Sequence, residues 1–250
     1  MEYVKSETHG GITTIEFYHP QSNSLPSRLL EKLAREIHLA DLLEESRVII
    51  LKSEGDKSFC AGASFDELIQ IKTQQEGLAF FSGFAHVINA MRKCSKLIIA
   101  RVQGKAVGGG VGLIAAADYA IATEKADIKL SELAVGIGPF VVGPAVERKI
   151  GTAAFSALAI DASMWRNTDW ARKKGLYAEV HESIENMNES VQRLADTLSH
   201  SSPVAMAELK KICWKDTGHW DTLLLERAAI SGKLILSEFA RDAIKKFKSK

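Results

Sequence analysis

Two stretches of small residues are places where the backbone itself could do chemistry. The first is Cys60-Ala61-Gly62-Ala63-Ser64, and the second begins at Gly108-Gly109-Gly110. Glycine and alanine leave peptide N–H groups uncovered, and a helix that begins at such a turn points its first unpaired N–H groups outward. Two N–H groups converging from separate turns could hold a negatively charged oxygen, and losing one such donor typically costs about 3–4 kcal/mol of transition-state stabilisation. The alternative is that these small residues only let neighbouring layers pack closely.

Other chemical motifs do not fit these stretches. A dinucleotide fingerprint needs glycine where Leu113 stands, and neither stretch supplies the Gly-Lys-Ser/Thr of a P-loop. The run at 62–66 lacks the last glycine of a hydrolase elbow. The histidines and cysteines show no metal-ligand spacing, so we expect no metal. Cys60 and Ser64 could be nucleophiles, but no histidine close in sequence suggests a partner, which favours small turn residues.

The elements that must position the two turns alternate between strands and helices. Short apolar runs predict strands, and apolar residues at helical spacing predict helices between them. After about residue 185 only helical patterns follow. This order predicts an α/β fold with parallel strands and a helical C-terminal layer. The expected strands are at 12–17, 47–53, 96–104 and 119–124, and the expected helices begin near Ser27 and cover 77–93 and 112–118.

Length, composition and charge narrow the class of protein. The 250 residues suit one large domain, or one domain with a smaller appendage, and 46% hydrophobic with 25% charged residues is ordinary globular composition. The net charge of +1, with no basic stripe, predicts no nucleic-acid partner. The 3 scattered cysteines are expected to be reduced thiols of a cytoplasmic protein. We expect no secretion signal and no membrane partner, because no apolar run is long enough.

Both turns, in this order and at this spacing, resemble the crotonase (enoyl-CoA hydratase/isomerase) superfamily. FCAGASFDEL at 59–68 looks like its first turn, and the stretch at 102–139 looks like its G-G-G block with the acidic residue that follows. The resemblance covers essentially the whole chain. It implies a crotonase-like spiral of ββα units over 1–188 and a helical trimerisation region over 189–250. It also implies an acyl-CoA substrate, no cofactor other than the CoA of that substrate, and a homotrimer or dimer of trimers.

The resemblance also assigns roles by motif position. The two oxyanion donors fall on the backbone N–H groups of Ala63 and Gly109, which would hold a thioester oxygen as it becomes an enolate. The neighbouring Ala61 and Gly62 would contribute to CoA binding. At the other end of the chain, Phe247 and Lys250 match positions that contact the adenine and phosphates of CoA.

One acid/base residue is present and a second is missing. Hydratases of this family commonly use two glutamates; one matches Glu132, and the other is replaced by Gly112. Small and apolar neighbours would desolvate Glu132, which suits a carboxylate acting as both acid and base. A single base suits a 1,3-proton shift and so favours an isomerase. However, the spaced pair Pro139 and Pro144 resembles a branch of bacterial hydratases associated with methylglutaconyl-CoA, and we expect Gly112 and Pro139 to border the acyl pocket.

We therefore expect an acyl-CoA-dependent hydro-lyase of the enoyl-CoA hydratase type, with a branched glutaconyl-CoA as one possible substrate. A Δ3,Δ2-enoyl-CoA isomerase is the first alternative. A non-catalytic crotonase-fold scaffold or RNA-binding homologue is the second, and the retained Glu132 and near-neutral charge count against it.

Overall fold

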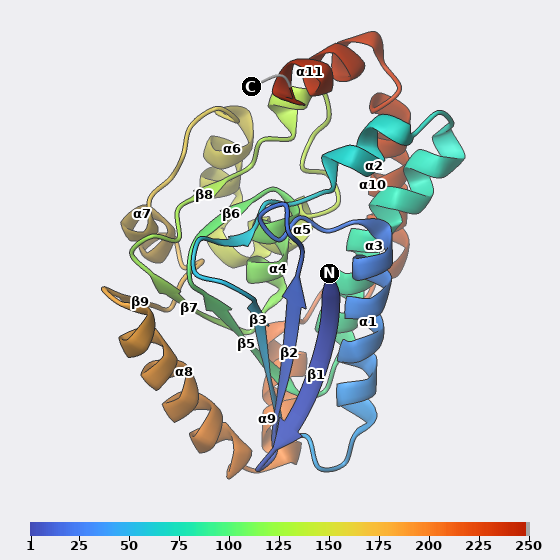
Figure 1. Ribbon diagram of the computed structural model, residues 1–250. Coiled ribbons are helices and arrows are strands. Elements are labelled where there is room, and N and C mark those ends of the chain that lie inside the picture. The colour runs from blue at the N-terminus through green and yellow to red at the C-terminus, as the bar shows by residue number, and fades with distance from the viewer. Residues whose placement is uncertain (249–250) are drawn as a thin grey trace.

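The fold is built on two sheets, and from β3 onward successive strands alternate between them (Figure 1). The computed structural model describes residues 1–248, with side chains described to residue 246. The large sheet has the order β1-β2-β3-β5-β7-β9, and the small sheet has the order β4-β6-β8. The strands are β1 Tyr3–His9, β2 Ile12–Tyr18, β3 Val48–Ser53, β4 Ser58–Cys60, β5 Leu97–Val102, β6 Lys105–Val107, β7 Tyr119–Thr123, β8 Ile128–Lys129 and β9 Glu179–His181.

Helices fill the connections between the strands and cover the sheets. None of the helices within residues 1–248 is long and apolar enough to cross a membrane. The helices are α1 Ser27–Leu42, α2 Phe65–Gln70, α3 Gln74–Lys93, α4 Gly109–Ala116, η1 Leu133–Val135 (a 3₁₀ turn), α5 Gly143–Ile150, α6 Thr152–Ile160, α7 Thr168–Lys173, α8 Ile184–Ser199, α9 Pro203–Cys213, α10 Trp220–Leu234 and α11 Glu238–Lys248.

The parallel strands β3, β5 and β7 of the large sheet are buried on both faces, which explains their continuous apolar sequences. In β3, Val48 and Ile50 belong to a cluster with Met187 of α8, whereas Ile49 and Leu51 belong to the main core. Successive side chains of a strand point to opposite faces, so α8 covers one face while α1 and α3 cover the other (Figure 1). Both faces therefore need apolar residues.

The strand order repeats a ββα unit that winds into a spiral. β3, β5 and β7 enter the large sheet, and each is followed by a strand of the small sheet, β4, β6 and β8. The small sheet is parallel throughout, so the carboxyl ends of its strands lie along one edge. The segments after Cys60, Val107 and Lys129 therefore emerge side by side. This confirms the expected crotonase-like α/β spiral.

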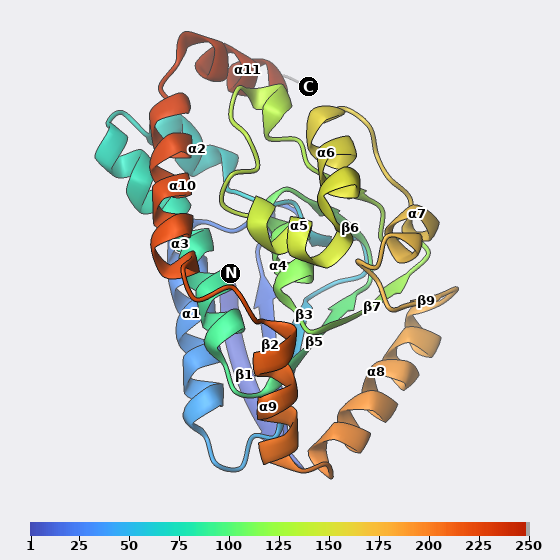
Figure 2. The same ribbon diagram turned by 180° about the vertical axis from the view of Figure 1, so that it is seen from behind.

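The C-terminal helices pack on the α/β body of the same chain. The expected boundary between 1–188 and 189–250 falls inside α8, which begins at Ile184 and packs against the large sheet. α10 runs alongside α3 (Figure 2), and a Cβ on Gly77 of α3 would lie 2.6 Å from the Cα of Gly232 in α10. The backbones of these two helices therefore touch. A trimerisation role for this region stays a prediction.

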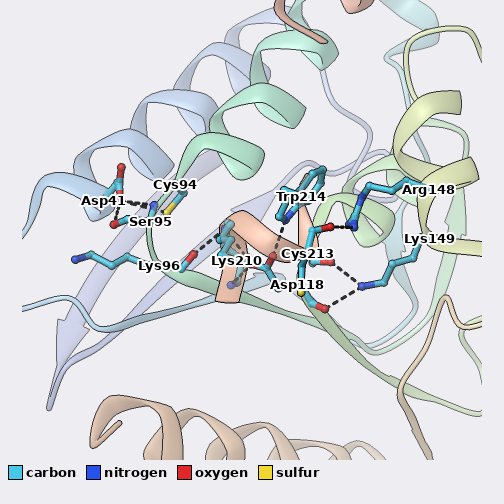
Figure 3. A network of polar contacts seen from close by, with 12 residues as sticks. Asp41, Cys94, Ser95, Lys96, Asp118, Arg148, Lys149, Lys210, Cys213 and Trp214 are labelled. Atoms are coloured by element: carbon cyan, nitrogen blue, oxygen red, sulfur yellow. Dashed lines mark hydrogen bonds and ion pairs between the residues drawn. The ribbon is translucent and has the colours of Figure 1, made fainter. Parts of the chain in front are cut away.

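A network of paired polar groups fastens α9 and α5 to the large sheet (Figure 3). Asp118 immediately precedes β7; its Oδ2 lies 2.9 Å from Nζ of Lys210 and accepts the backbone N–H of Ile98 at 2.8 Å. Its Oδ1 accepts Nε1–H of Trp214 at 2.8 Å. Lys149 donates to the carbonyl oxygen of Asp118 at 2.9 Å. Each oxygen of this carboxylate therefore has a partner.

Candidate active site

The two small-residue turns meet at the carboxyl edge of the small sheet. Gly62 has φ +86°, a conformation that favours glycine. A Cβ on Gly62 would lie 2.8 Å from the carbonyl oxygen of Val107 and 3.4 Å from the amide nitrogen of Gly109. The turn after β4 thus lies directly against the turn after β6, because neither side chain nor Cβ separates them.

Each glycine of the second turn faces a different neighbour. A Cβ on Gly108 would lie 3.0 Å from Oε1 of Glu132, and one on Gly109 would lie 2.1 Å from the ring of Phe84. A Cβ on Gly110 would lie 2.6 Å from the carbonyl oxygen that ends β4. The glycines therefore allow close packing between neighbouring segments, which was the alternative explanation for the small residues. They also bring Glu132 next to the start of α4.

Two amides at these turns have no acceptor among the described residues. Gly109 is the first residue of α4, so no helical carbonyl precedes it. Leu25 donates to the carbonyl of Gly62 at 2.8 Å and accepts from Ser64 at 3.4 Å, which leaves the N–H of Ala63 on the opposite side. Within residues 1–248, neither the Ala63 N–H nor the Gly109 N–H donates a hydrogen bond. Both residues line the same pocket.

Glu132 presents a buried carboxyl group to this pocket. It follows β8 and directly precedes η1, so the third strand of the small sheet positions it. Its Oε2 is buried and has no hydrogen-bond partner among the described residues. Burial raises the pKa of Glu132 to about 7, although a hydrogen bond from its own backbone N–H acts in the opposite direction. A carboxyl group with a pKa near neutrality can both accept and return a proton.

The pocket around these groups, called here the active-site pocket, is small and mostly apolar. Its volume is about 60 Å³, and among the described residues no lysine, arginine or histidine lines it. Apart from backbone groups, its polar side chains are Ser131, Glu132 and Ser231. The remaining lining is Ala61, Gly62, Ala63, Phe65, Leu68, Phe81, Phe84, Val107, Gly108, Gly109, Val135, Ile137, Gly138, Pro139, Phe140, Val141 and Val142.

Most of the residues predicted from the sequence come together here, but Gly112 does not. Ala61, Gly62 and Pro139 line the pocket with the residues above. Gly112 lies within α4 behind the pocket wall, and a Cβ there would lie 2.5 Å from Cγ1 of Val142. Val142 fills the space beside Gly112 and itself faces the pocket. The expectation that Gly112 would border the pocket is therefore corrected.

Two predicted CoA contacts lie at the C-terminus. The side chain of Phe247 and the whole of Lys250 fall outside the described residues. Their contacts with the adenine and phosphates of CoA stay predictions.

Cys60 and Ser64 have structural roles in the first turn. Burial raises the pKa of the Cys60 thiol to about 12, and its sulfur accepts the N–H of Gly62 at 3.3 Å. Ser64 is the N-cap of α2 and accepts the N–H of Glu67 at 3.4 Å. These contacts agree with the interpretation as small turn residues, because a thiol this hard to ionise is a poor nucleophile.

Sequence reasoning missed much of the pocket wall. Phe84 from α3 and Ser231 from α10 reach the pocket through the contact between those two helices. Phe140 and Val142 come from the loop and turn before α5. A patterned sequence shows that such residues are apolar or small, but not which cavity they face. Only the adjacency of Phe140 to the predicted Pro139 could have indicated it.

Fold and site together define a protein of the crotonase class. The chain belongs to the enoyl-CoA hydratase/isomerase family, whose model matches residues 7–246. It is 28% identical to a short-chain-enoyl-CoA hydratase of Clostridium acetobutylicum, over 96% of this chain and 92% of the relative. A human mitochondrial 3-hydroxyisobutyryl-CoA hydrolase is 29% identical over 60% of this chain and 41% of its own length. The crystal structure of an enoyl-CoA hydratase from Bacillus halodurans shares the fold, with a TM-score of 0.89, 20% identity and coverage of 98% of this chain and 99% of that one.

Proposed function

We propose that this protein adds water to 2-enoyl-CoA thioesters whose acyl groups are short and uncharged. One observation carries the proposal: among the described residues, the buried Oε2 of Glu132 has no hydrogen-bond partner, and it shares a partly open, mostly apolar pocket with two amides, Ala63 and Gly109, that also lack one. Buried polar groups are normally satisfied by hydrogen bonds, so such a set is typical of a site that a ligand completes.

The geometry supports the following steps. The thioester oxygen accepts hydrogen bonds from the N–H groups of Ala63 and Gly109. Glu132 accepts a proton from water while the hydroxide oxygen adds to C3, and the C2–C3 electron pair moves so that negative charge develops on the thioester oxygen. Glu132 then returns the proton to C2, which regenerates the carboxylate. One carboxylate handles both transfers, so water adds to a single face of the double bond.

A pKa near neutrality suits this double role. If the carboxyl group of Glu132 were a much stronger acid, its carboxylate would be too weak a base to take a proton from water. If it were much weaker, it would be protonated before water arrived. The value of about 7 lies between these limits at physiological pH.

An isomerase is the second candidate, and one observation favours it. Glu132 is the one carboxylate among the described residues of the pocket lining, and Val142 fills the space next to Gly112. A second carboxylate that would hold the attacking water is therefore missing. A single base suffices to move a proton from C2 to C4.

A glutaconyl-type substrate is less suited to this pocket. Its distal carboxylate would lie in apolar surroundings, and the described lining offers no cation to pair with it. Burying an unpaired charge costs several kcal/mol. We therefore propose an acyl group without a second charge.

The test is turnover of the purified protein in ¹⁸O-labelled water. The panel is crotonyl-CoA, 3-methylglutaconyl-CoA, 3-hexenoyl-CoA and 3-hydroxyisobutyryl-CoA, with mass spectrometry of the products and a thiol assay for released CoA. We expect one labelled oxygen in 3-hydroxybutyryl-CoA and at least about tenfold lower kcat/KM on 3-methylglutaconyl-CoA. Double-bond migration without incorporation of label would show that the protein is an isomerase and not a hydratase. Release of CoA would show that it is a hydrolase.

A further inference from the structure

Two neighbouring cavities share one aromatic residue of their linings, Phe140. The active-site pocket has a volume of about 60 Å³, and a second cavity of about 260 Å³ lies next to it. Pro139 and Phe140 line both. The second cavity, called here the outer cavity, is otherwise lined by Gly143, Pro144, Glu147, Phe155, Ala159 and Arg227.

Phe140 is held in place between them. A Cβ on Gly138 would lie 2.4 Å from the tip of the Phe140 ring, so the ring packs directly on that glycine. The N–H of Phe140 donates to the carbonyl of Gly138 at 2.7 Å, and the N–H of Gly143 donates to the carbonyl of Pro139 at 2.7 Å. This tight turn leads directly into α5, so the chain that carries the ring is fixed at both ends.

The volume of the active-site pocket matches a short acyl group. A cavity needs at least about 10–15 Å³ to hold one water molecule. A pocket of about 60 Å³ therefore has room for only a few groups of that size, which suits a short acyl chain. The outer cavity, at about 260 Å³, is several times larger.

The charged groups are also distributed unequally between the two cavities. Glu147 and Arg227 line the outer cavity, and Oε1 of Glu147 accepts the hydroxyl of Thr152 at 2.7 Å. On the other side of the ring, the described lining of the active-site pocket carries no cation. The ring of Phe140 therefore also separates an apolar space from a partly charged one.

We propose that Phe140 sets the acyl-chain length that this protein accepts. Its ring ends the space that the active-site pocket offers to an acyl chain, and removing the ring joins the pocket to the outer cavity so that a medium-length apolar chain can enter. The inference rests on the proposed function for its substrate class, because it places the acyl group in the active-site pocket. It concerns binding, however, and can be tested without any reaction.

The test compares Phe140→Ala with Phe155→Ala. Phe155 lines the outer cavity but not the active-site pocket, and its ring lies 3.0 Å from the position of a Cβ on Gly143. Removing the Phe155 ring should therefore enlarge the outer cavity and leave Phe140 in place. Dissociation constants for butyryl-CoA and octanoyl-CoA, measured by calorimetry, avoid any dependence on turnover. The wild type should bind butyryl-CoA at least about tenfold more tightly than octanoyl-CoA. Phe140→Ala should reverse that order, and Phe155→Ala should keep it.

A more conservative variant protects the test against misfolding. Phe140→Leu shortens the wall with little change in apolar character, and it should raise octanoyl-CoA affinity by a smaller factor, about threefold or more. Circular dichroism checks that each variant is folded. An unchanged preference in folded Phe140→Ala and Phe140→Leu, or a wild type that binds both esters equally, would overturn the inference.

Turnover assays keep the two proposals separable. The kcat/KM values on crotonyl-CoA and 2-octenoyl-CoA are measured for the same proteins. If the binding preference reverses but no variant hydrates either ester, the proposed reaction fails while the role of Phe140 stands. If crotonyl-CoA is hydrated but the preference does not move, the reaction stands and the role of Phe140 is refuted.

Discussion

Asp118 and Glu132 are carboxylates withdrawn from solvent within the same α/β body, yet their surroundings differ. Both oxygens of Asp118 have partners, including Lys210 at 2.9 Å and Trp214 at 2.8 Å (Figure 3). Oε2 of Glu132 has none among the described residues, and burial raises its pKa to about 7. Buried polar groups in native structures are nearly always satisfied, so Asp118 follows the rule and Glu132 departs from it.

The difference separates a group that stabilises the fold from a group kept available for chemistry. Pairing Asp118 with Lys210 fixes α9 on the sheet, and removing either partner would leave a buried charge uncompensated. Leaving Glu132 unpaired costs stability whenever it is ionised. A fold keeps such a group when a ligand supplies the missing partner, and perturbed carboxyl groups in pockets are accordingly typical of functional sites.

The largest effect is expected from Glu132→Gln. The amide keeps the shape of the side chain but cannot take a proton from water, so kcat should fall by about 10²–10⁴-fold. Affinity for butyryl-CoA should stay within about threefold, and the fold should be retained. Steady-state kinetics and calorimetry measure both. The matched control is Glu208→Gln, an exposed glutamate on α9 that should keep wild-type rates. Near wild-type turnover in Glu132→Gln would remove this residue from the mechanism.

Ala63→Pro removes the N–H of Ala63, a backbone donor that makes no hydrogen bond within residues 1–248. Turnover should fall by about 10²–10³-fold, because one of two oxyanion donors is lost. Ala63→Gly is the control, since it removes the methyl group and keeps the N–H, and it should retain most of the activity. Circular dichroism has to show an intact fold in both variants. Equal rates in Ala63→Pro and Ala63→Gly would mean that this turn only packs.

Asp118→Asn should produce the opposite pattern from Glu132→Gln. It leaves Lys210 buried without a counter-charge, so the free energy of unfolding should fall by about 3–5 kcal/mol. The kcat of the molecules that remain folded should stay within about threefold of the wild type. Urea unfolding at fixed protein concentration gives the first value. Combining Asp118→Asn with Lys210→Met should recover part of the loss, and a loss of kcat with unchanged stability would contradict the structural role.

The pH dependence of stability should reveal the unpaired state of Glu132. Its pKa is raised from 4.5 to about 7, so the folded state binds more protons than the unfolded state between these values. The free energy of unfolding therefore falls as pH rises through this window, by up to about 3 kcal/mol. Glu132→Gln lacks this contribution. The difference between the two proteins in urea unfolding should grow from pH 4.5 to pH 8, and a constant difference would show that the carboxyl group is solvated.

Part of this architecture could be predicted from the sequence. The runs at 12–17, 47–53, 96–104 and 119–124 correspond to β2, β3, β5 and β7, because buried parallel strands leave a continuous apolar signal. β4, β6 and β8 left no such signal, since strands of two or three residues are too short to show a period. The small sheet that positions the site could therefore not be predicted from hydrophobic periodicity. The glycine- and alanine-rich turns that follow its strands could be recognised in the sequence.

The site divides in the same way. Ala63, Gly109 and Glu132 could be predicted from the motifs that carry them, and they line one pocket. That Oε2 of Glu132 is unpartnered depends on what surrounds it in space, which no motif contains. Gly112 shows the limit most clearly. Its lack of a side chain suggested open space, but the space belongs to Val142, whose position is set by the chain before α5.

The smallest effect, and the sharpest test of packing beside the site, is expected at Gly112. In the wild type, Gly112→Ala places a Cβ 2.5 Å from Cγ1 of Val142, so overpacking should lower the free energy of unfolding by about 1–3 kcal/mol. In the background of Val142→Gly that clash is gone, because the nearest remaining atom is the Cα of residue 142 at 3.7 Å, and alanine is favoured over glycine within a helix by about 1 kcal/mol. The same substitution should then stabilise the protein.

This change of sign is measured by urea unfolding of the wild type, both single variants and the double variant. Because the two side chains share one space, their coupling free energy should be about 0.5–3 kcal/mol. Additive effects would mean that Gly112 has free space after all. A glutamate at position 112 could then reach the pocket, and the single substitution Gly112→Glu would be enough to supply a second carboxylate. If the coupling is found, a second carboxylate is excluded by Val142 as well, and restoring it requires both Gly112→Glu and Val142→Gly.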